Sequence, residues 1–320
     1  MRSKPLVRPP KLVPGCRVAL IAPAGPLLER DDLTRAEALC RALGYDPVLG
    51  KSAHAHHGYL AGTDDERLDD LNSALVDPAI HAIWCIRGGY GSIRLLDRID
   101  YDAMSRRPKI VVGFSDITAL LNAITEMTGV VTFHGPVARA AMPAFSRRHF
   151  ELVLAGNTLA GRLGRLPVPM GELVSTENRI VTLRAGIAEG PLVGGNLTLL
   201  QCLVGTPYFP ELAGAILFLE DVGEDLYRVD RMLSHLRLVG ALQQLAGIII
   251  GRFTELKRST GDGALGFDEV LAHYLDPLGI PAAYGFPIGH IDDQWTLPLG
   301  VTARLDAGAG EVELIEPAVA

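Results

Sequence analysis

The chain has 320 residues, 48% of them hydrophobic, and a formal net charge of −7. This length exceeds what a single hydrophobic core usually supports, so we expect two domains, and the hydrophobic content excludes a disordered protein. The longest apolar runs are too short to span a bilayer, and the evenly spread acidic charge offers no basic stripe for nucleic acid.

The first half of the chain alternates predicted strands and helices. Short apolar runs rich in β-branched residues predict strands at 18–22, 82–87, 110–112 and 130–133, and helical spacing of apolar residues predicts helices at 33–43, 64–75 and 117–124. Such alternation is typical of a mainly parallel sheet covered by helices on both faces. Ligands of open α/β sheets bind at the carboxyl ends of the strands, where the glycine-rich residues 88–91 and Ser115 are expected.

The composition changes after about Phe150. Residues 156–178 are rich in glycine, proline and polar residues, which favours a linker between domains. Further strands are predicted at 215–219 and 247–251, helices at 226–236 and 267–275, and a hairpin within 295–316. We therefore expect an N-terminal α/β domain over 1–155, a linker over 156–185, and a smaller mixed α/β domain over 186–320.

Ser115 is the first candidate for chemistry. It lies between a predicted strand and a predicted helix, so its hydroxyl is expected on a tight turn that also presents the N-terminus of the helix. The residues around it, Gly-Phe-Ser-Asp-Ile, meet only half of the G-x-S-x-G pattern. The alternative is that Ser115 or Asp116 only caps the helix.

A serine nucleophile needs a base and a carboxylate that orients the base. Of the nine histidines, His134 and His290 lie in suggestive places. His134 is followed by Gly-Pro, which suggests a structural turn, whereas the glycine-rich loop around His290 leaves it free to point into a cleft. Glu220 closes a predicted strand, where a charge is costly without a partner, and Asp221 and Glu224 are the alternative carboxylates.

The third requirement is a set of donors for a developing oxyanion. The backbone N–H groups of Gly88 and Gly89, in the Gly-Gly-Tyr-Gly run, have no Cβ in the way, and the N–H of Asp116 begins a helix. No Lys-Ser/Thr follows this run, so it is not a phosphate-binding Walker loop. No G-x-G-x-x-G follows the first strand either, which argues against a dinucleotide site.

The chain resembles the serine LD-carboxypeptidase family, which includes the microcin C immunity peptidases. The resemblance implies a Ser-Glu-His triad that matches Ser115, Glu220 and His290, with oxyanion donors on Gly89 and Asp116. It also implies a Rossmann-like N-terminal sandwich and a second, smaller domain. The matching segments are Ile21-Ala-Pro23, Leu60-Ala-Gly-Thr63 with Arg67, residues 82–91, Gly113-Phe-Ser-Asp116, Phe133-His-Gly-Pro136, Gly194-Gly-Asn-Leu197, Gly205-Thr-Pro207, Leu219-Glu-Asp221, Arg231-Met-Leu233 and Gly289-His290.

The implied reaction is the release of the terminal D-alanine from murein tetrapeptides during cell-wall recycling, with no metal and no cofactor. We expect a cytoplasmic protein, because the N-terminus has no apolar signal segment and the four cysteines are scattered like reduced thiols. The resemblance also suggests a homodimer.

Two alternative functions remain open: hydrolysis of aminoacyl-nucleotides, and binding of a peptide or nucleotide without turnover. Trp295 is the only tryptophan that could stack on a base, and no insertion between residues 223 and 247 is evident to cover a nucleotide, so we favour the tetrapeptide. Arg87, Arg94 and Arg252 are candidates for holding its carboxylate.

Overall fold

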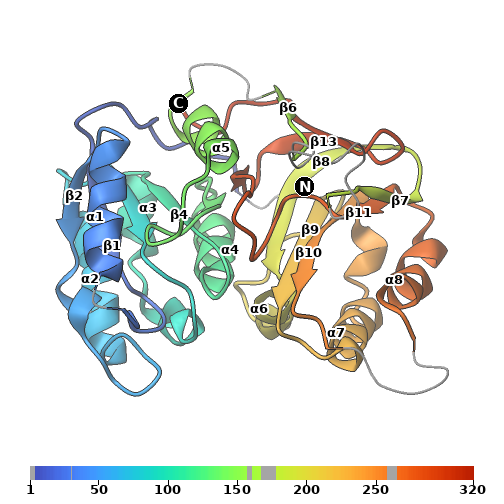
Figure 1. Ribbon diagram of the computed structural model, residues 1–320, viewed down its shortest axis with the longest axis horizontal. Coiled ribbons are helices and arrows are strands. Elements are labelled where there is room, and N and C mark those ends of the chain that lie inside the picture. Colours follow the sequence, from blue (N-terminus) through green and yellow to red (C-terminus); the bar gives the residue numbers. More distant parts are fainter. Residues whose placement is uncertain (1–3, 30, 157–160, 167–177, 258–264) are drawn as a thin grey trace, which may run out of the picture.

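The computed structural model describes residues 4–29, 31–156, 161–166, 178–257 and 265–320. Two sheets, each flanked by helices, lie side by side (Figure 1). The predicted class is confirmed: an N-terminal parallel sheet with helices on both faces, and a second domain of mixed strands and helices. No helix within the described residues has the length and apolarity to cross a membrane.

The first sheet has the order β12-β5-β4-β3-β1-β2, and all of its neighbouring strands except β12 are parallel. Between β1 and β3 the chain changes the direction in which it adds strands, so the loops that follow these two strands border a crevice. The elements of this domain are β1 (Arg17–Ile21), α1 (Asp32–Ala42), β2 (Asp46–Leu49), η1 (Lys51–His54), α2 (Asp64–Val76), β3 (Ala82–Cys85), η2 (Ser92–Arg98), α3 (Tyr101–Arg106), β4 (Ile110–Gly113), α4 (Ile117–Thr128), β5 (Phe133–His134) and α5 (Ala144–Leu154).

The second sheet has the order β6-β14-β13-β8-β9-β10-β11-β7, and its four central strands from β8 to β11 run parallel. The hairpin expected near the end of the chain is confirmed as β13 and β14. The elements are β6 (Gly161–Leu163), β7 (Val181–Arg184), β8 (Ile187–Asn196), α6 (Leu197–Leu203), β9 (Ile216–Val222), α7 (Leu226–Leu238), η3 (Leu242–Gln244), β10 (Gly247–Thr254), α8 (Phe267–Leu275), η4 (Asp276–Leu278), β11 (Ala282–Tyr284), β13 (Thr302–Asp306) and β14 (Glu311–Leu314).

Segments of the chain pair across the predicted domain bounds at two places. The expected linker 156–185 contributes β6 and β7, which pair with β14 and β11 of the second sheet, although residues 157–160 and 167–177 of it lie outside the described residues. From the predicted second domain, β12 (Leu297–Pro298) returns to pair with β5, and the last residue, Ala320, bonds to Pro9. These segments are short and join edges of sheets, so their apolar periodicity is too weak to reveal them.

Helix α4 joins the two domains. The Asn122 side chain donates to the Gly194 carbonyl at 2.9 Å, and the Asn196 backbone N–H donates to the Thr118 hydroxyl at 3.0 Å. Because Asn196 pairs with Glu220 across β8 and β9, this contact brings the carboxylate of the second sheet close to the helix that follows Ser115.

Candidate active site

Ser115 occupies the turn between β4 and α4, as predicted, and its backbone is left-handed with φ of 64°. Asp116 is the residue that precedes the first helical residue, and its side chain makes no capping hydrogen bond. The Ser115 hydroxyl contacts His290 instead of the helix N–H groups. The structure therefore does not support the capping alternative.

The three predicted side chains meet at the boundary of the two domains. The Ser115 Oγ lies 3.0 Å from the Nε2 of His290, and the Nδ1 of His290 lies 2.8 Å from Oε2 of Glu220. When Nδ1–H donates to the carboxylate, Nε2 is free to accept the proton of the serine hydroxyl. This geometry can activate Ser115 as a nucleophile.

Glu220 is fully buried in β9, whereas the side chain of His290 is 23% exposed. Burial raises the pKa of Glu220, and the hydrogen bond from His290 opposes that rise. Gly289 permits the close contact: its φ is +117°, and a Cβ there would lie 2.8 Å from Oε2 of Glu220. A side chain at position 289 would thus push the carboxylate away from the imidazole.

The alternative residues have other contacts. Asp221 accepts hydrogen bonds from Asn196 and Thr198, and Glu224 pairs with Arg228. His134 is fully buried, and neither of its ring nitrogens has a hydrogen-bond partner among the described residues. Of the residues weighed from the sequence, the structure therefore places Glu220 and His290 in line with Ser115.

The glycine loop lies directly against the serine. A Cβ on Gly88 would come within 2.9 Å of the Cβ of Ser115 and 3.3 Å of the Asp116 nitrogen, so only glycine fits there without displacement. Among the backbone hydrogen bonds of loops, turns and caps in the described residues, none has the N–H of Gly89 or of Asp116 as its donor. Both N–H groups are thus candidates for a ligand oxygen.

The sequence analysis assigned no side-chain role to three groups that shape the site. The buried Asp116 carboxylate accepts from the N–H groups of Gly91 (3.2 Å) and Ser92 (2.8 Å), and burial raises its pKa. The ring of Phe114 packs edge-on to His290 at 4.9 Å between centroids, and Arg67 bonds to the loop carbonyl of Gly91. A charge among the apolar positions of the helix 64–75 was the available signal for Arg67.

The residues weighed for substrate binding are mostly engaged elsewhere. Arg87 donates to the Pro26 carbonyl and Arg94 pairs with Asp64, while Arg252 is half-buried in β10. Trp295 is 1% exposed, and its indole N–H donates to the Gly164 carbonyl, so it is not available to stack on a base. The indole packs against Phe286, with 5.6 Å between the ring centroids.

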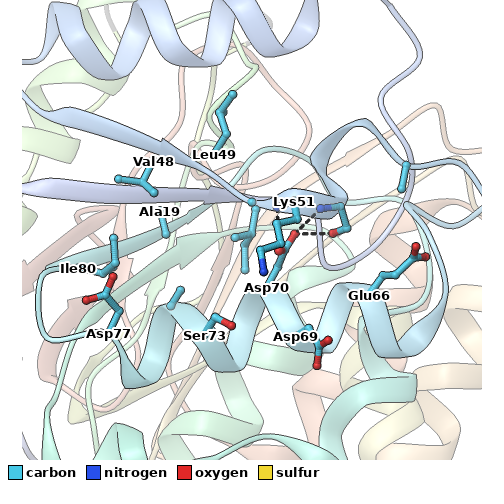
Figure 2. A pocket seen from close by; sticks show the side chains of 15 residues that line it. Ala19, Val48, Leu49, Lys51, Glu66, Asp69, Asp70, Ser73, Asp77 and Ile80 are labelled. Atoms are coloured by element: carbon cyan, nitrogen blue, oxygen red, sulfur yellow. Dashed lines mark hydrogen bonds between the residues drawn. The ribbon is translucent and has the colours of Figure 1, made fainter.

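A separate cavity of about 300 Å³ lies between α2 and the first two strands (Figure 2). Its lining includes apolar side chains from the two strands, and the side chains of Lys51, Asp69 and Asp70. Asp70 is satisfied locally, because it accepts from the backbone of Lys51 and from both the N–H and hydroxyl of Ser52. No triad residue lines this cavity, and among the described residues no group of His, Cys, Asp and Glu is arranged to hold a metal.

Two descriptions of known protein domains match most of the chain. The sequence matches the LD-carboxypeptidase N-terminal domain over residues 18–135 and the LD-carboxypeptidase C-terminal domain over residues 189–305. The chain belongs to the LD-carboxypeptidase family.

Two kinds of family member resemble the chain nearly end to end. The murein tetrapeptide carboxypeptidase of Pseudomonas aeruginosa is 36% identical over 301 residues, covering 91% of this chain and 93% of the relative. A solved muramoyltetrapeptide carboxypeptidase from Oxalobacter formigenes has a TM-score of 0.79 at 31% identity, covering 93% and 97% of the two chains.

The microcin C7 self-immunity protein of Escherichia coli is also similar, at 30% identity over 341 residues, covering 99% of this chain and 97% of the relative. Its structure in complex with glutamyl sulfamoyl guanosine has a TM-score of 0.86, at 27% identity over 98% of this chain and 99% of that chain. Family membership thus supports a carboxypeptidase and does not by itself identify the substrate.

Proposed function

We propose that this LD-carboxypeptidase family member is a serine peptidase that releases the terminal D-alanine from murein tetrapeptides. The observation that carries the proposal is the continuous contact from Ser115 through His290 to Glu220. Similarity to a murein tetrapeptide carboxypeptidase supports the substrate.

In the proposed reaction Ser115 Oγ attacks the carbonyl carbon that precedes D-alanine, and its proton passes to Nε2 of His290. Glu220 stabilises the resulting imidazolium, and the N–H groups of Gly89 and Asp116 receive the oxyanion. His290 then protonates the leaving amine of D-alanine as the C–N bond breaks. A water molecule, deprotonated by His290, cleaves the acyl ester and restores the serine.

The test measures free D-alanine released from L-Ala-γ-D-Glu-diaminopimelate-D-Ala by the native protein and by Ser115→Ala. We expect the substitution to lower turnover by several orders of magnitude, because the nucleophile is lost. A serine-directed phosphonate should label Ser115 in the native protein, as located by peptide mapping. Near-normal turnover by Ser115→Ala would reject the serine mechanism, and absence of both turnover and labelling would favour a binding protein.

Hydrolysis of aminoacyl-nucleotides is the second candidate, because the fold is closely similar to that of the self-immunity protein in complex with glutamyl sulfamoyl guanosine. The burial of Trp295 removes the one stacking group that the sequence offered for it. Incubation with an aminoacyl sulfamoyl adenylate decides between the two, since faster hydrolysis of that compound than of the tetrapeptide would overturn our choice.

A further inference from the structure

The peptide between Gly88 and Gly89 is held from outside its own loop. The Gly25 N–H, in the loop after β1, donates to the Gly88 carbonyl at 3.1 Å. No peptide among the described residues is cis, and in a trans peptide the C=O and the next N–H point in opposite directions. The bond from Gly25 therefore turns the Gly89 N–H away from the loop 23–26.

Gly25 and Gly89 are in direct contact. A Cβ on Gly25 would lie 3.1 Å from the Gly88 oxygen and 3.4 Å from the Cα of Gly89, and a Cβ on Gly89 would lie 3.0 Å from the Cα of Gly25. The loop after β1 thus approaches the loop after β3 as closely as backbone atoms allow. Any side chain at position 25 changes the orientation of the Gly88–Gly89 peptide or separates the loops.

The side chain of Arg67 also connects these two loops. Its side chain is fully buried, and its Nη1 donates both to the Pro23 carbonyl and to the Gly91 carbonyl, the latter at 3.0 Å. Its Nη2 pairs with Asp64 at 2.5 Å, which balances the buried charge. A planar guanidinium can hold two carbonyls and a carboxylate in one fixed arrangement, which the ammonium of a lysine cannot reproduce.

We propose that Gly25 and Arg67 are positioning residues that set the Gly88–Gly89 peptide so that the Gly89 N–H faces the substrate carbonyl oxygen at Ser115. This inference rests on the proposed serine mechanism and adds two residues that do not touch the substrate. It places them at the crevice between β1 and β3, where the strand order changes direction.

Gly25→Ala is the first test, because its φ is not in the left-handed region and alanine strains only the contact with Gly88. We expect kcat on the tetrapeptide to fall by about 10- to 100-fold while KM stays within about twofold, since the oxyanion forms only in the transition state. The rate of phosphonate labelling at Ser115 should fall in parallel. Gly164→Ala is the matched control, because among the described residues no atom beyond its chain neighbours lies within 4 Å of the added Cβ, and its φ is outside the left-handed region.

Arg67→Lys is the second variant, because lysine keeps the positive charge but lacks the planar guanidinium group. We expect the same selective loss of kcat, with thermal unfolding of both variants followed to show that they are folded. The inference is overturned if Gly25→Ala and Arg67→Lys match Gly164→Ala in kcat and labelling rate, or if they raise KM and leave kcat unchanged. A native protein that neither turns over nor is labelled rejects the proposed function, and this inference with it.

Discussion

His134 shows how the fold treats a titratable side chain that the proposed mechanism does not use. Its ring lies in contact with Phe114 and Phe218, at 6.0 and 5.2 Å between centroids. Burial, and secondarily the neighbouring His290, lowers the pKa of His134 to about 3. The imidazole therefore stays neutral at ordinary pH, so that no second positive charge opposes protonation of His290.

The first prediction concerns the pH dependence of stability. An unfolded histidine titrates near its ordinary pKa of 6.5. As the pH falls below 6.5, His134 therefore binds a proton in the unfolded chain but not in the folded protein. The free energy of unfolding decreases accordingly until about pH 3, where the folded protein also binds the proton. His134→Leu removes this penalty, so its stability relative to the native protein should rise on acidification by up to about 1.4 kcal/mol per pH unit.

Urea unfolding at pH 7, 6, 5 and 4 measures this difference. His56→Leu is the control for the exchange of a histidine for a leucine at an exposed position. Parallel pH profiles for native protein and His134→Leu would contradict the assignment of a neutral, buried His134.

At the scale of elements, the unit that presents the candidate nucleophile is β4, the turn at Ser115, and α4. Ser115 and Glu255 are the non-glycine residues with positive φ among the described residues. A left-handed conformation costs an L-residue with a Cβ about 1–2 kcal/mol. The strand and the helix, both nearly completely buried, provide the packing that holds the turn in this conformation.

The second prediction compares two variants that both lack the hydroxyl. Ser115→Gly and Ser115→Ala should both be inactive, but Ser115→Gly should be more stable than Ser115→Ala by about 1 kcal/mol, because glycine adopts the left-handed region freely. Urea unfolding of the pair isolates the backbone contribution, since the side-chain contact with His290 is absent from both. A Ser115→Ala protein as stable as Ser115→Gly would show that the turn is not strained.

At the scale of the whole molecule, the candidate site depends on how the two sheets are docked. Ser115 comes from the first sheet, while Glu220 and His290 come from the second domain. The hydrogen bond from the Asn196 N–H to the Thr118 hydroxyl joins α4 to β8 at their contact. Thr118 lies three residues after Ser115, so we expect this bond to influence the distance between the serine and the other two residues.

The third prediction tests this docking with Thr118→Val. The change keeps the shape of the side chain and leaves the buried Asn196 N–H without its acceptor, which should cost about 1–3 kcal/mol of stability. We also expect a clear fall in kcat on the tetrapeptide, because the Ser115–His290 contact spans the same boundary.

Thr128→Val is the matched control on the same helix. It also removes an acceptor from a buried backbone N–H, that of Val130 at 3.0 Å, but at the end of α4 within the first domain. It should lose stability and keep its kcat. Equal turnover in both variants would show that the docking of α4 on β8 does not control the site.

Local sequence patterns were sufficient to predict most central elements. Buried parallel strands are continuous apolar runs and their helices carry apolar stripes, so β1, β3, β4, α2 and α4 could be placed within a few residues. The edge strands β6, β7 and β12 could not, because short edge strands bury little surface and leave little periodicity. For that reason the sequence did not reveal which segments pair across the predicted domain bounds.

The candidate site could likewise be predicted only in part from the sequence. The sequence alone determined that Ser115 follows a strand, that Glu220 is a charge at the end of an apolar strand, and that His290 lies in a glycine-rich loop, since each of these is a property of neighbouring residues. That the three side chains meet, and that Arg67 and Gly25 hold the glycine loop, was decided only by the tertiary structure. These contacts join residues that lie from 24 to 175 positions apart in the chain, and no local pattern encodes the distance between such residues.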